Sequence, residues 1–182
     1  MISNFFKHLH MVNKHKYLVF KLSLKAGIPL RGLLHDLSKY SPSEFLESVK
    51  YYDGKISPLK VCKLKNGYSK AWIHHKGRNK HNFEYWYDFN TSDKTPIIPY
   101  VYTVEMICDT LAAGMAYKGK DWTPKGSIEY FENRKDLDYI NDKIKNVLRE
   151  VYKQVEENGL DKTLNKKNLK RIYYKYVNAI YI

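Results

Sequence analysis

Three observations predict an all-α fold for this chain of 182 residues. Apolar residues recur at three- and four-residue steps through most of the sequence, which is the spacing of one helix face. Gly and Pro stand where these periodic stretches end or begin. An apolar content of 43% is enough for one hydrophobic core, and nothing in the composition indicates disorder. We therefore expect one helical domain over residues 1–182.

Helix boundaries in the first half follow from capping residues. Gly27 is a natural C-terminal stop for the first helix, and Pro29 suits the first turn of the next. The sequence SPSE at residues 41–44 is a capping box with Pro in the first turn, so a third helix should begin there. The expected helices of this half span residues 5–26, 29–39, 41–52 and 69–76, with residues 55–66 irregular.

The second half contains longer periodic stretches. A polar segment, DFNTSDKTPIIP, precedes them, and the linker KGKDWTPKG divides a core at about residues 8–118 from a C-terminal helical extension at about residues 127–182. The aromatic end RIYYKYVNAIYI forms either a packing cap or a dimer surface, and we favour packing. The expected helices of this half span residues 100–117, 127–133 and 137–158, and residue 163 to the end.

Charge and cysteine usage limit the class of protein. Lys and His interrupt the first 20 residues at short intervals, which argues against a signal peptide or a membrane span. Cys62 and Cys108 are far apart and neither belongs to a CxxC pair, so we expect no disulfide framework, no thiolate zinc site and a cytoplasmic location. The net charge of +13 attracts anions, but an AT-rich coding sequence gives the same excess of Lys, Tyr, Asn and Ile.

The adjacent pair His35-Asp36, in the segment RGLLHDLSKYSP, is the starting point for a predicted metal site. An imidazole offers one nitrogen lone pair and a carboxylate one or two oxygens. A mixed set therefore suits one or two divalent ions of Mn, Fe, Co, Zn or Ni. Cysteine-poor sites of this kind usually carry out hydrolytic or oxygen chemistry. Other potential ligands stand before and after the pair in the chain: His15, His74, His75, His81 and Asp109.

Each of these ligands also has a purely structural interpretation. His15 lies on the apolar face of the first helix and could be a hydrogen-bonded core histidine. Asp109 could pair with a lysine or cap a helix. His74 and His75 diverge by about 100° on a helix, so at most one of them comfortably shares the face toward the first helix. His81 could fold back toward the same place, or all three histidines could be solvated. A His-Asp pair also occurs by chance.

Taken together, the order His, His-Asp, His-His, Asp across four predicted helices resembles the HD superfamily of metal-dependent phosphohydrolases, over residues 8 to about 118. The segments GLLHDLSKYSPSEF, AWIHHKGRNKHNFEYW and EMICDTLAAGMAYKG are similar to the HD-like family of unknown function DUF5662, and these motifs are long and specific. The resemblance implies an HD-domain-like helical bundle with additional C-terminal helices. It also implies a basal metal quartet of His15, His35, Asp36 and Asp109, and no particular substrate.

Two features depart from the HD pattern. Some HD nucleotidases carry a Glu three residues after the Asp of the pair, whereas this chain has Lys39. We expect Lys39 to contact a phosphate or compensate charge, with an exposed lysine as the alternative. His75 and His81 resemble the extra ligands of binuclear members, although the gap between them is shorter than usual. The number of ions therefore stays open.

The predicted reaction is hydrolysis of a phosphoester or phosphoanhydride in a nucleotide-like small molecule. A metal ion would lower the pKa of a bound water and polarise a phosphoryl oxygen. Asp36 would hold the metal and orient the water, and His74 or His81 would protonate the leaving oxygen. We expect the phosphate charge to be neutralised by Lys39, Lys76 and Arg78.

Aromatic residues near the histidines have two interpretations. Trp72, Tyr85 and Trp86 could stack on a nucleotide base, but aromatic side chains beside a buried helix more often belong to the core.

Two other functions fit the sequence. A di-iron centre bound by His15, His35, Asp36, His75, His81 and Asp109 would resemble the HD oxygenases that cleave inositol or phosphonate carbon bonds. Iron content and an oxygen requirement distinguish this function. A non-catalytic module would instead bind nucleic acid, with a strong salt dependence unaffected by His35→Ala. Its basic contacts would be Lys143, Lys145, Lys166, Lys167, Lys170 and Arg171.

Overall fold

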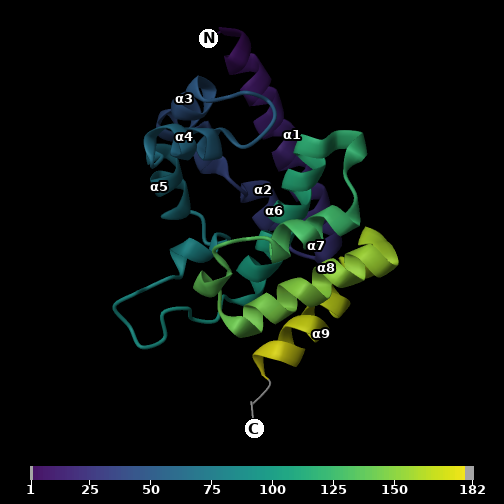
Figure 1. Ribbon diagram of the computed structural model, residues 1–182. Helices are drawn as coiled ribbons and strands as arrows, with labels where there is room; N and C mark the ends of the chain where they lie inside the picture. The colour runs from purple at the N-terminus through teal and green to yellow at the C-terminus, as the bar shows by residue number, and fades with distance from the viewer. Residues whose placement is uncertain (1, 179–182) are drawn as a thin grey trace.

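The computed structural model describes residues 2–178, which contain nine α-helices and four short 3₁₀ helices joined by loops (Figure 1). No strand occurs among these residues, and the all-α prediction is confirmed. The α-helices are α1 (Ile2–Ala26), α2 (Pro29–Leu34), α3 (Pro42–Lys50), α4 (Pro58–Asn66), α5 (Lys70–Lys76), α6 (Tyr100–Lys118), α7 (Pro124–Glu132), α8 (Asp142–Thr163) and α9 (Lys166–Val177). The 3₁₀ helices are η1 (Leu37–Tyr40), η2 (Phe83–Tyr85), η3 (Gly119–Asp121) and η4 (Leu137–Tyr139).

Helix α1 contacts helices from both halves of the chain. It packs mainly against α6, which runs in the opposite direction, and against α2 (Figure 1). Helices α3, α4 and α5 group beside its N-terminal half, while α8 packs between α7 and α9. Within residues 2–178 no helix combines the length and the apolar character needed to cross a membrane.

The hydrophobic core lies between α1, α6, α8 and α9. Its fully buried members include Val19, Leu111, Ile144, Val151 and Ile172. Burying an aliphatic side chain of this size contributes roughly 1.5–3 kcal/mol, so the core holds α1 firmly against α6. The adjoining faces of these two helices are thereby fixed, and both carry polar residues beyond the edge of the core.

The segment 29–39 is not one helix, so that prediction was wrong. Helix α2 ends before His35, and Asp36 has a φ of 52°, in the left-handed region that L-residues rarely adopt. Leu33 and Leu37, on either side of the pair, are 55% and 51% exposed. The buried side chains here are His35 and Asp36 themselves. The chain therefore bends to turn two polar groups inward.

Two other local predictions were wrong. Residues 55–66, expected to be irregular, contain α4, because Pro58 sits in its first turn and Gly67 ends it with a φ of 79°. The side chain of Ser41 does not cap α3. Glu44, the other half of the expected capping box, is buried and turns toward the histidines of α5 instead.

The C-terminal helices occur as predicted, with shifted boundaries. Helix α8 begins after η4 and continues through a non-helical residue, Gly159, whose φ is 78°. Helix α9 begins after Asn165, whose side chain caps it. In the aromatic segment, Ile172 and Tyr173 are buried in the core. Residues 179–182, the end of the predicted last helix, lie outside the described residues.

Gly32 lets α2 approach α1 closely. A Cβ atom at this position would lie 2.5 Å from the Cβ of Ser23 and 3.1 Å from the Cα of Phe20. Because the second contact is with backbone, a side-chain rotation cannot relieve it. We expect Gly32→Ala to destabilise the protein by about 1–3 kcal/mol, measured by denaturant unfolding, through overpacking at this contact.

Gly126→Ala is the matched control for this prediction. A Cβ there would meet chiefly the flexible end of the Lys118 side chain, so a change below about 0.5 kcal/mol is expected. Equal unfolding midpoints for the two variants would contradict the proposed packing of α2.

Candidate metal centre

Four polar side chains from three parts of the chain converge beside the core. His15 comes from α1, His35 and Asp36 from the turn after α2, and Asp109 from α6. The Nε2 atoms of His15 and His35 lie 2.9 and 3.3 Å from Oδ1 of Asp109. The Nε2 atom of His35 is also 3.1 Å from Oδ2 of Asp36. One donor atom from each of the four side chains lies within 4.8 Å of the other three, which is close enough to share one ion.

A second group of donors adjoins the first and shares Asp36. His75, near the end of α5, and His81, in the loop after it, both place Nε2 3.4 Å from Oδ1 of Asp36. Both rings are buried. His81 therefore folds back after the α5 helix, and the carboxylate of Asp36 lies between two sets of imidazoles.

Unpaired atoms in the centre test whether a metal fits. Three buried atoms form no hydrogen bond: Nε2 of His15, Nε2 of His35 and Oδ1 of Asp36. Carboxylate oxygens nevertheless lie 2.9 and 3.1 Å from the two imidazole nitrogens. An unsatisfied buried polar group costs about 1–3 kcal/mol. A divalent cation bound by imidazole nitrogen and carboxylate oxygen would satisfy these atoms, so the donor set fits a metal.

Glu105 contacts two of the imidazoles on the Nδ1 side, opposite the Nε2 atoms that face Asp36. It is fully buried on α6, and its Oε1 lies 3.1 Å from Nδ1 of His35 and 3.4 Å from Nδ1 of His81. Arg31 donates from Nη2 and Nε to Oε2 of the same carboxylate, at 2.6 and 2.8 Å. With Nδ1 of His35 hydrogen-bonded to Glu105 and Nδ1 of His81 close to the same oxygen, both rings present Nε2 toward Asp36. A carboxylate behind a ligating imidazole is the usual second-shell arrangement of metal-binding histidines.

The charge of Glu105 is stabilised by its partners. Burial raises the pKa of its carboxyl, but the contacts with His35 and His81 outweigh burial and lower the pKa to about 2. From the sequence alone, Glu105 has no predicted role. The available signal was its position one helical turn before Asp109, on the same face of α6.

Glu44 plays the same part for the histidines of α5. Its Oε2 lies 2.8 Å from Nδ1 of His75, and its Oε1 lies 2.7 Å from Nδ1 of His74. Burial raises the pKa of Glu44, but these hydrogen bonds lower the pKa by a larger amount, so the net shift is downward. Of the two adjacent histidines, His75 faces Asp36 and His74 belongs to neither donor group.

Lys39 brings a positive charge to the shared carboxylate. Its ammonium lies 2.6 Å from Oδ2 of Asp36, and its side chain is 27% exposed. Burial raises the pKa of Asp36, but the charges of His35 and Lys39 outweigh burial and hold the pKa well below its ordinary value. Burial likewise raises the pKa of Asp109, but the close contacts of His15 and His35 outweigh burial and hold the pKa well below its ordinary value. Both carboxylates are therefore anionic at neutral pH.

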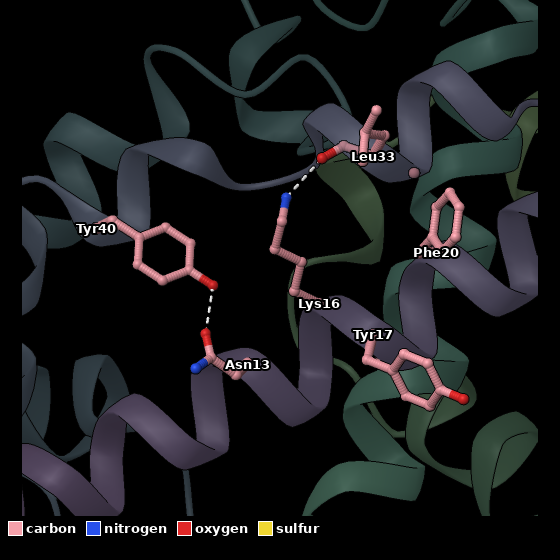
Figure 2. A pocket seen from close by; sticks show the side chains of 7 residues that line it. Asn13, Lys16, Tyr17, Phe20, Leu33 and Tyr40 are labelled. Atoms are coloured by element: carbon pink, nitrogen blue, oxygen red, sulfur yellow. Dashed lines mark hydrogen bonds between the residues drawn. The ribbon is translucent and has the colours of Figure 1, made fainter.

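Lys16 anchors the His35–Asp36 turn to α1 from outside. Its ammonium donates to the carbonyl oxygens of Leu33 and His35, at 2.6 and 2.9 Å, which satisfies carbonyl groups at the C-terminal end of α2. Figure 2 shows Lys16 in a surface pocket whose walls include Tyr17 and Tyr40. None of the residues lining this pocket is a histidine or a carboxylate, so we assign no chemistry to it.

Other predicted contact residues lie outside this centre. Arg78 is exposed, and neither it nor Lys76 forms an ion pair or a side-chain hydrogen bond with any residue from 2 to 178. Trp72 stacks on His75, with ring centroids 5.7 Å apart, so it supports a candidate ligand. Trp86 donates from Nε1 to the carbonyl of Lys80.

Two of the lysines considered for nucleic-acid binding are engaged within the fold. Lys143 donates from Nζ to the carbonyl of Val177, at 3.0 Å. Lys145 lies 2.6 Å from a carboxylate oxygen of Asp142. These contacts reduce the basic surface that the C-terminal helices offer to a polyanion.

The fold and the centre define an all-α protein with a buried histidine–carboxylate site able to hold metal. The family model described as a family of unknown function, DUF5662, matches residues 4–154, and the chain belongs to this family. The match contains every residue of the centre and ends within α8. No curated protein and no solved structure matches the chain.

The Glu44 contacts lead to a prediction about metal affinity. Glu44→Gln removes the charge that holds Nδ1 of His75, and loss of such a partner typically weakens metal binding by about 10–100-fold. We expect this loss only for metal bound by the donor group of His75, measured by titrating metal-free protein with Zn²⁺ in a calorimeter.

Glu47→Gln is the matched control on the same helix. Glu47 accepts from Ser69 and from the amide of Ala71 and has no histidine partner. Its variant should bind Zn²⁺ like the wild type. Weakening by both variants alike, or by neither, would contradict the role given to Glu44.

Proposed function

We propose that this chain is an HD-like, metal-dependent phosphohydrolase that hydrolyses a phosphoester or phosphoanhydride of a nucleotide-like small molecule. The observation that carries the proposal is the carboxylate of Asp36, which lies between two groups of imidazoles and beside the ammonium of Lys39. The order of donors along the chain, from His15 to Asp109, is that of HD phosphohydrolases. Two free, buried cysteines suit the cytoplasmic location that we also propose.

We assign the candidate ligands to two ions. His15, His35 and Asp109 would hold one ion, His75 and His81 the other, and Asp36 both. Divalent Mn, Fe, Co, Zn or Ni suits these ligands and would supply Lewis acidity, which polarises the phosphoryl group and lowers the pKa of a coordinated water. Glu44 and Glu105 keep the imidazoles in place.

Lys39 is the residue that we assign to the phosphate. The ammonium of its partly exposed side chain already pairs with an oxyanion, and an ammonium donates equally well to a phosphate oxygen. For the proton given to the leaving oxygen, we prefer His74 to His81. Both ring nitrogens of His81 face carboxylates, whereas His74 is bonded only through Nδ1. Lys76 and Arg78 stay proposed as outer phosphate contacts.

The role of Lys39 separates phosphate binding from metal binding. Lys39→Met removes a charge-assisted hydrogen bond worth about 1.5–3 kcal/mol, so kcat/KM for a phosphate ester should fall about 10–150-fold. Metal affinity should be kept or increased, because a cation that competes for Asp36 is gone. Steady-state kinetics and a metal titration on the same preparation measure both quantities.

Lys60→Met, at an exposed position on α4, is the control and should leave both quantities unchanged. Unaltered kinetics in Lys39→Met, or a parallel loss of metal, would contradict the assignment of Lys39.

The proposed reaction is tested by loading the purified protein with Mn²⁺, Fe²⁺ or Co²⁺ in separate preparations. Each preparation is then assayed for phosphate release and diester cleavage on a panel of nucleoside mono-, di- and triphosphates, cyclic nucleotides and an aryl phosphodiester. We expect metal-dependent turnover of at least one class. Metal-loaded protein that turns over none of them would overturn the proposed function.

A second function is favoured by the same six ligands. Because His75 and His81 join the quartet at Asp36, the centre also has the ligand set expected for a di-iron HD-type oxygenase. Iron-loaded protein that consumes oxygen with a polyol or a phosphonate, and leaves phosphate esters intact, would establish this alternative. Oxygen-independent phosphate release would exclude it.

A further inference from the structure

His8 is a buried polar residue that the proposed mechanism does not use. It stands on α1 two turns before His15, and residues seven apart share a helix face. The side chain is only 6% exposed, and its Nδ1 forms no hydrogen bond. A buried hydrogen-bonding atom without a partner destabilises the fold, so the presence of the unpaired Nδ1 on the α1 face that also carries His15 needs an explanation.

The neighbours of His8 are aromatic rings and a nearby cation. Its ring centroid lies 5.1 Å from that of Phe45 and 5.4 Å from that of Tyr52. Burial lowers the pKa of His8 to about 4, and the charge of Lys39 contributes to the decrease. His8 is therefore neutral at physiological pH.

Helix α6 brings a phenol to the same end of the centre. Tyr117 stands two turns after Asp109, and because α6 runs opposite to α1, both helices extend from the centre toward the His8 end (Figure 1). Burial raises the pKa of Tyr117, with smaller effects from Lys39 and Tyr52. The ring of Tyr52 contacts that of His8, and the charge of Lys39 acts on the pKa of both His8 and Tyr117.

We propose that His8 is a specificity-determining residue that donates or accepts a hydrogen bond with an uncharged hydroxyl or amide on the organic part of the substrate. The inference rests on the proposed function, in which the ions and Lys39 hold the phosphate. A rise of 1.5 Å per residue places His8 about 10 Å along α1 from His15, roughly the length of a sugar-sized group. The substrate class is thus a phosphate ester with a polar, uncharged group about that far from the phosphorus.

The neutral state of His8 and its aromatic neighbours favour this chemistry over a second anion. A neutral imidazole has one donor and one acceptor nitrogen, which matches a hydroxyl or an amide. A ligand that lacks such a group would leave Nδ1 unpaired, and sites built around a hydrogen bond discriminate strongly against analogues without one.

The test uses Zn²⁺-loaded protein labelled with ¹⁵N-histidine and three kinds of probe. These are inorganic phosphate, benzylphosphonate, and the non-hydrolysable 5′-methylenephosphonates of nucleosides with four different bases. We expect at least one nucleoside phosphonate to shift the His8 ring nitrogens and to bind at least tenfold more tightly than benzylphosphonate. His8→Phe should remove this difference while changing the Kd of inorganic phosphate less than twofold. His8→Gln, which keeps a hydrogen-bonding side chain, should restore part of it.

One outcome would overturn the role of His8 alone, and another would overturn the proposed function as well. Inorganic phosphate and phosphonates that bind while the His8 resonances stay unmoved, with equal affinities in His8→Phe, would overturn the His8 assignment and indicate that water alone satisfies the ring. Failure of the loaded protein to bind any of the probes would overturn the proposed function itself, and the assignment with it.

Discussion

Replacing Asp36 by asparagine is expected to weaken the binding of both proposed ions by more than about a hundredfold and to reduce the proposed phosphohydrolase activity to background. Asn keeps the size of Asp and tolerates the left-handed φ of 52° at this position, so the turn itself should persist. What is lost is the negative charge between the two groups of imidazoles. We expect a larger loss of metal affinity than from replacing a carboxylate that only contacts a ligand, because Asp36 alone belongs to both donor groups.

Metal content by mass spectrometry and activity on the same samples measure this effect. Asp53→Asn is the control, because Asp53 is an exposed turn residue that bonds only to nearby backbone amides. Its variant should match the wild type. Asp36→Asn protein that keeps its metal and its activity would contradict the shared role of Asp36.

Replacing Glu105 by alanine is expected to produce the largest loss of stability. The change leaves the guanidinium of Arg31 and the Nδ1 atoms of His35 and His81 without their common partner. Removing one member of a buried ion pair typically costs 3–5 kcal/mol. Because Arg31 is 33% exposed and water can partly solvate it, we expect about 3 kcal/mol for metal-free protein, measured by urea unfolding.

The double variant Arg31→Met/Glu105→Met separates charge from packing. Replacing both partners by apolar side chains leaves no unpaired charge from this ion pair, so it should cost less than Glu105→Ala alone. A double variant as unstable as the single one would show that the ion pair with Arg31 is not the source of the loss.

The candidate ligands could be predicted from the sequence because each belongs to a local pattern. His15 lies on an apolar helix face, and His35-Asp36 is a recognisable pair. The structure brings these residues together with His75, His81 and Asp109. The sequence left the choice between His74 and His75 open, because it depends on which ring meets Asp36 once α3 and α5 are packed.

The partners of the supporting carboxylates could not be predicted, for a physical reason. Glu44 has an ordinary local explanation as half of a capping box, and its contact with His74 and His75 exists only after α3 packs on α5. Glu105 sits in a helix whose apolar face gives no sign of a partner on α2. The bend at Asp36 was missed for the same reason, since tertiary contacts such as those of Lys16 hold it.

The central claim is that two divalent ions share Asp36 at the junction of α1, α2, α5 and α6. Metal stoichiometry of the wild-type protein tests it most directly. Metal-free protein is loaded with Mn²⁺ under reducing conditions, freed of excess ion, and its metal and protein contents are determined together. We predict two ions per chain, with an electron paramagnetic resonance spectrum showing spin coupling between them. Protein that retains at most one Mn²⁺ per chain, and at most one ion of Fe²⁺, Co²⁺ or Zn²⁺ under the same treatment, would contradict the account.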